Sequence, residues 1–178
     1  YLLPGLVRQL LEDAPQMPLV LTENFTVRLL ELLRTGEIDV GIMALPLPET
    51  GMMVQPVYDE SFAIAVPRHH AWAKSRGVAS EDLKQETMLL LGTGHCFRDQ
   101  VLEVCPEMAR FSATAEGFQK TFEGSSLDTI RHMVASGLGV TVLPMSSVPE
   151  TPPKDSLIAY VPFTAPVPSR RVVLVWRK

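Results

Sequence analysis

The sequence predicts an α/β fold in two lobes with mixed sheets, and three observations support that prediction. Apolar residues repeat with helical spacing over residues 2–13, 25–35 and 126–136. Runs of Val, Ile, Leu and Met resemble strands buried on both faces, at 19–21, 38–45, 52–57, 62–66, 87–91, 139–143, 157–161 and 172–176. Two polar joints, at 58–61 and near 157–168, connect apolar strands without a helix. A chain that leaves one α/β lobe, builds a second and returns needs two such joints.

These joints set the predicted domain organisation. Lobe I is expected to comprise residues 1–60 and 166–178, and lobe II residues 61–165. Gly36 and Gly137 follow two of the helical segments as stop signals, and Pro4 lies in the first turn of the first helix. No internal repeat interrupts this pattern.

Composition and charge limit the function classes. The 178 residues carry a net charge of −4, and their Lys and Arg are scattered, so this part of the protein is not expected to bind a phosphate backbone. No apolar run is long enough to span a membrane, and no signal-peptide pattern is visible. The chain begins without Met inside a helical pattern, so we expect it to be a piece of a longer, cytoplasmic protein.

The two cysteines lie in the segment with the most chemical information. After the strand at 87–91, two glycines make a permissive turn, and residues 97–104 have helical spacing until Pro106. Cys96 is therefore expected near a helix N-terminus, beside His95 and close to Arg98. Both a helix N-terminus and positive charge favour the thiolate, which is the nucleophilic form of cysteine.

The spacing of the cysteines predicts a conformational switch. If residues 97–104 are helical, nine residues at about 1.5 Å each separate Cys96 from Cys105 by roughly 13 Å along the axis. A disulfide needs Cα atoms within roughly 7 Å. A bond between them would therefore unwind or displace this segment.

Two simpler interpretations of the cysteines stay open on these grounds alone. Cysteine is among the most buried residue types, so the pair could be inert packing residues. A metal site built from His95, Cys96 and Cys105 lacks close ligand pairing and an obvious fourth ligand, so we expect no metal and no cofactor.

The block from Gly94 to Gln100, followed by Cys105, resembles the redox loop of the hydrogen-peroxide-sensing LysR-type transcriptional regulators. The resemblance extends over nearly the whole chain, through residues 1–4, 36–40, 126–131 and 137–144. It implies a periplasmic-binding-protein-like regulatory domain, in which Cys96 attacks peroxide and Cys105 resolves the sulfenic acid into a reversible disulfide. The segment 106–122, which the resemblance implies moves on oxidation, is about six residues longer than in the family members.

The same resemblance assigns roles to individual residues and partners. It implies a peroxide-binding set comprising Thr26, Gly94, His95, Asp99 and Arg170. Arg98, from its charge near Cys96, is a further candidate for stabilising the thiolate. Thr26 could instead be a plain helix cap, and Arg170 a surface arginine. The resemblance also implies dimers and tetramers, and binding of promoter DNA and RNA polymerase by the full-length protein, whose N-terminal winged helix-turn-helix is absent from this chain. The output would be control of antioxidant genes.

Two other functions compete with peroxide sensing. A LysR-type domain could bind a small organic effector between its lobes, and the cysteines would then be incidental. A thiol peroxidase enzyme would need a dedicated reductant, and the chain has no thioredoxin-like Cys-x-x-Cys. We therefore expect a sensor rather than an enzyme.

Overall fold

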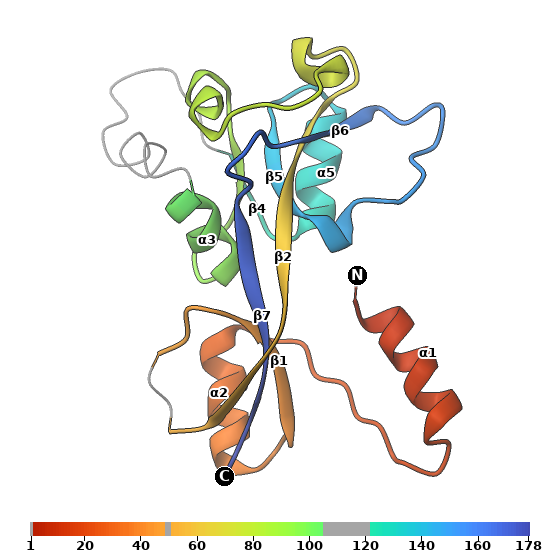
Figure 1. Cartoon of the computed structure of the whole chain (residues 1–178), viewed down its shortest axis with the longest axis vertical. Helices are drawn as coiled ribbons and strands as arrows, with labels where there is room; N and C mark the ends of the chain where they lie inside the picture. The colour runs from red at the N-terminus through yellow and green to blue at the C-terminus, as the bar shows by residue number, and fades with distance from the viewer. Residues whose placement is uncertain (1, 49–50, 105–121) are drawn as a thin grey trace.

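The computed structural model describes residues 2–48, 51–104 and 122–178, in which helices alternate with strands (Figure 1). The α-helices are α1 (Leu3–Asp13), α2 (Thr26–Thr35), α3 (Cys96–Val104) and α5 (Leu127–Ala135). The short 3-10 helices are η1 (Ala71–Lys74), η2 (Ser80–Gln85) and η3 (Met145–Ser147). The strands are β1 (Val40–Ala44), β2 (Met53–Pro67), β3 (Leu89–Leu91), β4 (Phe122–Gly124), β5 (Thr141–Pro144), β6 (Ile158–Pro162) and β7 (Ser169–Trp176). The predicted α/β class is confirmed.

The long strand β2 passes through both lobes (Figure 1). Residues 53–61 pair antiparallel with β7, and residues 62–67 lie between β5 and β6. The predicted polar joint at 58–61 is therefore wrong, because the backbone continues there as a strand. Asp59 and Glu60 are tolerated in the strand because Arg171 and Arg170 of β7 stand directly opposite them and pair with their carboxylates.

Lobe I has a small hydrophobic core between α2 and the β1–β7–β2 sheet. Leu30 and Leu33 of α2 pack with Met43 of β1 and with Val173 and Val175 of β7. The exposed face of α2 carries charged residues, as an amphipathic helix on a sheet does. This core fixes α2 against the sheet and so fixes the position of its N-terminus.

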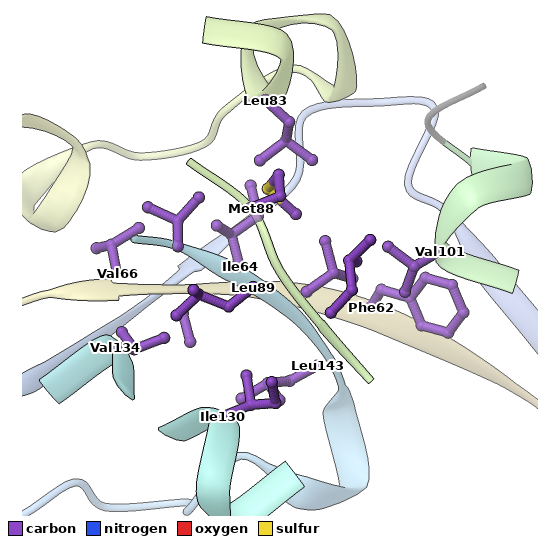
Figure 2. Close-up of a cluster of buried hydrophobic side chains, with 14 of the residues drawn as sticks. Phe62, Ile64, Val66, Leu83, Met88, Leu89, Val101, Ile130, Val134 and Leu143 are labelled. Carbon is purple, nitrogen blue, oxygen red and sulfur yellow. The ribbon is translucent and has the colours of Figure 1, made fainter. Parts of the chain in front are cut away.

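Lobe II has the larger core (Figure 2). β2, β5 and β6 form an antiparallel sheet, β3 and β4 pair in parallel, and β3 lies beside the start of β5 through the Met88–Val140 bridge. Both parallel and antiparallel pairs are present, so the predicted mixed sheets are confirmed. The fully buried side chains of this core include Phe62, Ile64, Leu83, Met88, Leu89, Ile130, Val134 and Leu143.

Local signals in the sequence set the helix ends. Gly36 has φ of +81° and ends α2, and Gly137 has φ of +79° just after α5, as predicted from these stop signals. Ser126 caps the start of α5, where its Oγ accepts a hydrogen bond from the Thr129 N–H at 3.1 Å.

The predicted strand at 19–21 is wrong. These residues have no regular structure, and Val20 is 87 % exposed. The run pairs with no strand among the described residues, so its apolar side chains have no sheet in which to pack. α1 likewise has no buried side chain. No helix in the described ranges is long and apolar enough to cross a membrane.

Candidate functional site

The segment from β3 into α3 carries the candidate reactive cysteine. β3 ends at the buried Leu91, a short turn follows, and α3 begins at Cys96, as the sequence predicted. Gly94 has φ of +97° within the turn, a conformation that glycine adopts without strain. Cys96 is a free, half-buried thiol at the positive end of the helix dipole. Its predicted partner Cys105 lies outside the described residues.

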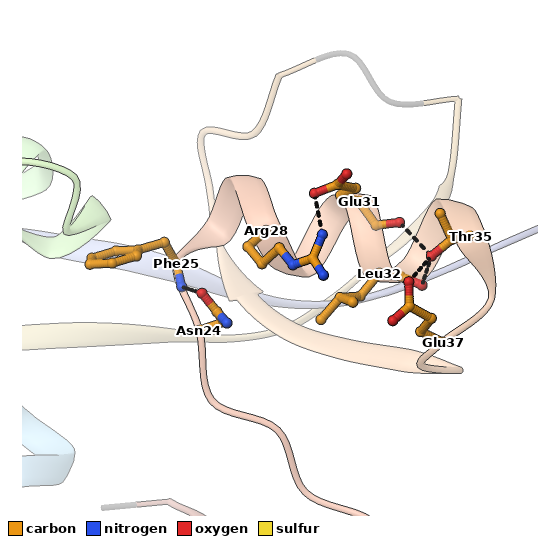
Figure 3. A network of polar contacts seen from close by, with 7 residues as sticks. All are labelled: Asn24, Phe25, Arg28, Glu31, Leu32, Thr35 and Glu37. Carbon is orange, nitrogen blue, oxygen red and sulfur yellow. Dashed lines mark hydrogen bonds and ion pairs between the residues drawn. The ribbon is translucent and has the colours of Figure 1, made fainter.

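Phe25 brings the start of α2 against this turn. Its ring meets the His95 ring edge-on, with 5.0 Å between centroids, and a Cβ built on Gly94 would lie 3.8 Å from the same ring. Figure 3 shows the Phe25 ring directed away from α2, next to Asn24, whose Oδ1 accepts a hydrogen bond from the Phe25 N–H at 2.9 Å. The N-termini of α2 and α3, which belong to different lobes, therefore converge.

Thr26 is the first residue of α2 and is half-buried. The N-cap position belongs to Phe25, and no side chain makes a cap hydrogen bond there. The simple explanation of Thr26 as a helix cap is therefore wrong. Thr26 directly follows Phe25, whose ring contacts His95.

Arg170 lies at the junction of the lobes and is not an ordinary surface arginine. Its Nε and Nη2 both lie 2.7 Å from Oε2 of Glu60, whose side chain is only 3 % exposed. The other Glu60 oxygen accepts a hydrogen bond from the Ser146 N–H at 3.1 Å. The Arg170 guanidinium also lies over the Phe97 ring, 5.1 Å from its centroid. The residue after Cys96 therefore packs against the predicted peroxide-polarising arginine.

A cavity of about 510 Å³ opens beside Arg170. It is lined by the segment after β1, by α3 and by the start of β7, through Leu45, Pro46, Leu47, Gln100, Glu103, Ser169, Arg170 and Arg171. Neither Cys96 nor Thr26 lines it. The cavity therefore adjoins α3 without being lined by the thiol.

Gln100 is the buried polar residue that sequence reasoning missed. It is 6 % exposed, and its Nε2 donates a hydrogen bond to the Leu45 carbonyl oxygen at 3.2 Å. Its buried Oε1 accepts no hydrogen bond from any described residue. Gln100 follows Cys96 by four positions in one helix, so both side chains lie on the same face of α3. That spacing was the available signal.

The structure gives Arg98 a different neighbourhood from the predicted one. Its Nη1 donates hydrogen bonds to the Leu91 carbonyl oxygen at 2.9 Å and to Oε1 of Glu123. These contacts direct the guanidinium towards β3 and β4, and Glu123 balances its charge. Asp99 is exposed in the first turn of α3. The described residues hold no cluster of three or more His, Cys, Asp or Glu that could bind a metal ion.

Comparison with known proteins identifies the fold family. The sequence profile of the LysR substrate binding domain matches residues 1–178. The chain belongs to the LysR substrate binding domain family. Among curated relatives of this LysR domain, the hydrogen peroxide-inducible genes activator of Pectobacterium carotovorum is 37 % identical over 99 % of this chain and 56 % of that protein. The DNA-binding transcriptional dual regulator OxyR of Escherichia coli is 36 % identical over the same shares. The chain thus spans about half the length of these relatives.

Solved structures resemble this LysR domain throughout. The reduced OxyR regulatory domain of Pseudomonas aeruginosa is 49 % identical with a TM-score of 0.86, over 99 % of this chain and 82 % of that one. A reduced form of OxyR from Neisseria meningitidis is 44 % identical with a TM-score of 0.91, over 100 % of this chain and 81 % of that one. A cysteine-to-serine variant of Corynebacterium glutamicum OxyR with H₂O₂ bound is 32 % identical with a TM-score of 0.86, over 98 % and 54 %. The predicted two-lobed regulatory fold is confirmed.

Proposed function

We propose that this chain is the sensor domain of a transcription regulator that detects hydrogen peroxide through a reversible Cys96–Cys105 disulfide. The observation that carries the proposal is the free, half-buried thiol of Cys96 at the first residue of α3, beside His95. The likeness to OxyR proteins, including one with H₂O₂ bound, supports the choice of oxidant. It does not favour an organic effector between the lobes.

The proposed chemistry has two balanced steps. The Cys96 thiolate attacks one peroxide oxygen, the O–O bond breaks, and the sulfur becomes a sulfenic acid while the other oxygen leaves as hydroxide and takes up a proton. The Cys105 sulfur then attacks the sulfenic sulfur, the S–O bond breaks, and a second water leaves with the thiol proton. Two thiols are oxidised, and one peroxide is reduced to two waters.

The geometry of α3 supports a switch driven by this bond. Eight helical steps separate the Cα atoms of Cys96 and Val104 by about 12 Å, and the next Cα is always about 3.8 Å further along the chain. With α3 intact, the Cα atoms of Cys96 and Cys105 are therefore at least about 8 Å apart. A disulfide allows roughly 7 Å. Forming the bond requires part of α3 to unwind.

We assign peroxide binding to residues near the N-termini of α2 and α3, which converge beside the turn that precedes Cys96. Thr26 comes from the start of α2, Gly94 and His95 from the turn, and Asp99 from the first turn of α3. The contact between Phe25 and His95 supports this convergence. Arg170 contacts Phe97, the neighbour of Cys96, and we assign it the polarisation of the peroxide.

We add Gln100 to this set. Its unsatisfied Oε1 is able to accept a hydrogen bond from a peroxide O–H on the helix face that carries Cys96.

The whole protein is proposed to act in the cytoplasm as a dimer or tetramer. The name of the relative in E. coli, a DNA-binding transcriptional dual regulator, supports a DNA-binding part outside this chain. That part would contact promoters and RNA polymerase and control antioxidant genes. We propose lobe boundaries at 60/61 and 165/166, and the change of the β2 partner from β7 to β5 after residue 61 supports the first. The domain would consume peroxide once per oxidation, as a sensor rather than an enzyme.

Peptide mapping without reductant, before and after a stoichiometric dose of peroxide, tests the proposal. We expect one new linked peptide that contains Cys96 and Cys105, and its reversal by dithiothreitol. No linked peptide at full Cys96 oxidation would contradict it. If the Cys96→Ser variant still regulates transcription in response to a small organic molecule, the domain is an effector-binding one. Sustained consumption of peroxide with a thiol donor would instead favour a peroxidase enzyme.

A further inference from the structure

Arg98 joins the two ends of the turn that carries Cys96. Its backbone lies in the first turn of α3, and its Nη1 donates to the carbonyl oxygen of Leu91, the last residue of β3. The same Nη1 forms an ion pair with Glu123 on the neighbouring strand β4. The side chain of Arg98 is 13 % exposed, so its guanidinium is largely shielded from water, whereas the Glu123 side chain is 47 % exposed. Arg98, which follows Cys96 in the chain, therefore holds the residue that ends the strand before it.

We propose that Arg98 is the positioning residue for the Cys96 turn in the reduced state, and that disulfide formation requires the Arg98–Glu123 pair to separate. This inference rests on the proposed peroxide-sensing function. It adds a positioning role to the thiolate-stabilising role that the sequence suggested, and it is argued from the observed contacts of Arg98 with Leu91 and Glu123.

The turn is the part of this region that yields most easily. Thr93 and Gly94 are exposed, and His95 and Cys96 are half-buried, whereas Val101 in the middle of α3 is 2 % exposed in the lobe II core. Moving the turn therefore exposes less apolar surface than extracting the middle of the helix. The hydrogen bonds and ion pair of Arg98 add to the resistance that comes from the buried Phe97 ring and the Phe25–His95 contact.

The pair has a modest but measurable strength. A charge-assisted hydrogen bond is stronger than a neutral one, but the Glu123 side chain is 47 % exposed, so water screens it. We expect loss of the Glu123 carboxylate to speed the step from sulfenic acid to disulfide by roughly three- to tenfold. The same factor is expected in the equilibrium between dithiol and disulfide in a glutathione buffer.

The test measures the two chemical steps separately in the full chain. Sulfenic acid formation is followed in a Cys105→Ser background, at a pH well above about 8.5 so that thiol ionisation does not differ between variants. Disulfide formation is followed in the two-cysteine chain. Glu123→Gln should accelerate only the second step, and Glu123→Asp, which keeps the charge but shortens the reach, should do so less.

Glu31→Gln is the matched control. It removes another Arg–Glu pair with a similarly exposed carboxylate, on α2, and both steps should stay unchanged. Equal disulfide rates in Glu123→Gln and the parent chain would overturn the role of the pair. Arg98→Gln that slows sulfenic acid formation at about pH 7, where a thiol of ordinary pKa is only partly ionised, would assign Arg98 to the thiolate instead. A parent chain that forms no disulfide would refute the proposed function itself.

Discussion

The Phe25 ring of one lobe lies edge-on against the His95 ring of the other, with 5.0 Å between their centroids. This contact holds the start of α2 beside the residue that precedes Cys96. Phe25 is 50 % exposed, so it contributes little to either core. Its main structural effect is to hold the start of α2, where Thr26 lies, close to the turn that precedes Cys96.

Phe25→Ala is therefore expected to slow the reaction of Cys96 with peroxide by about two- to tenfold, because an aromatic pair contributes about 0.5–1.5 kcal/mol to holding this geometry. Stopped-flow measurement of sulfenic acid formation checks it. Val27→Ala, which truncates a 78 % exposed side chain one residue into α2, is the control and should react at the parent rate. An unchanged rate in Phe25→Ala would contradict the positioning role.

Arg170→Ala is expected to destabilise the protein by about 2–4 kcal/mol, because it leaves the buried Glu60 carboxylate without its ionic partner. Urea denaturation measures this loss. Adding Glu60→Gln to Arg170→Ala should recover part of it, since the uncompensated charge is then gone. Arg171→Ala, which breaks an exposed pair with Asp59, should have a much smaller effect. Equal losses in the two arginine variants would contradict this account.

Gln100→Leu separates binding from stability. It removes an unsatisfied buried oxygen together with one hydrogen bond to Leu45, so stability should change by no more than about 1 kcal/mol. If Oε1 accepts a hydrogen bond from peroxide, the rate of sulfenic acid formation should still fall several-fold. A parent-like rate in the folded variant would remove Gln100 from the peroxide site.

Gly94→Ala tests the turn itself. The left-handed φ of +97° is strained for alanine, although the space around its Cβ is adequate, so we expect a loss of about 1–2 kcal/mol and slower oxidation of Cys96. Thermal unfolding and peroxide kinetics report the two effects. Gly5→Ala in α1 is the opposite case, since no neighbour lies near its Cβ, and helix propensity predicts slight stabilisation.

Asp59 makes a defined contribution to acid stability. Its hydrogen bonds to Arg171 lower its pKa below the usual 3.8, so the carboxylate is more stable as an anion in the folded state. The stabilisation is complete when the pH is above the pKa that Asp59 has in the unfolded chain. It disappears as the pH falls through the lower pKa that Asp59 has in the folded protein. Asp59→Asn should therefore flatten the stability curve below about pH 4. If the free energy of unfolding below about pH 4 depends on pH equally in Asp59→Asn and the parent chain, the Asp59–Arg171 pair does not make this contribution.

Local chemistry determined much of the fold from the sequence alone. Gly36 and Gly137 stop their helices because glycine adopts positive φ freely, and the turn before Cys96 was predicted for the same reason. These signals act between neighbours in the chain, so they can be read directly. They predicted Cys96 at the start of a helix, and they predicted the helices that end near Gly36 and Gly137.

Only the tertiary structure decided which distant residues meet. Glu60 pairs with Arg170 across 110 positions, which converts the predicted joint at 58–61 into continuous strand. Arg98 meets Glu123 across 25 positions, a contact that the position of Arg98 near Cys96 in the sequence does not indicate. Such pairs depend on strand register and core packing, which bring distant segments into contact. The local sequence of one segment does not specify which distant segment it will meet.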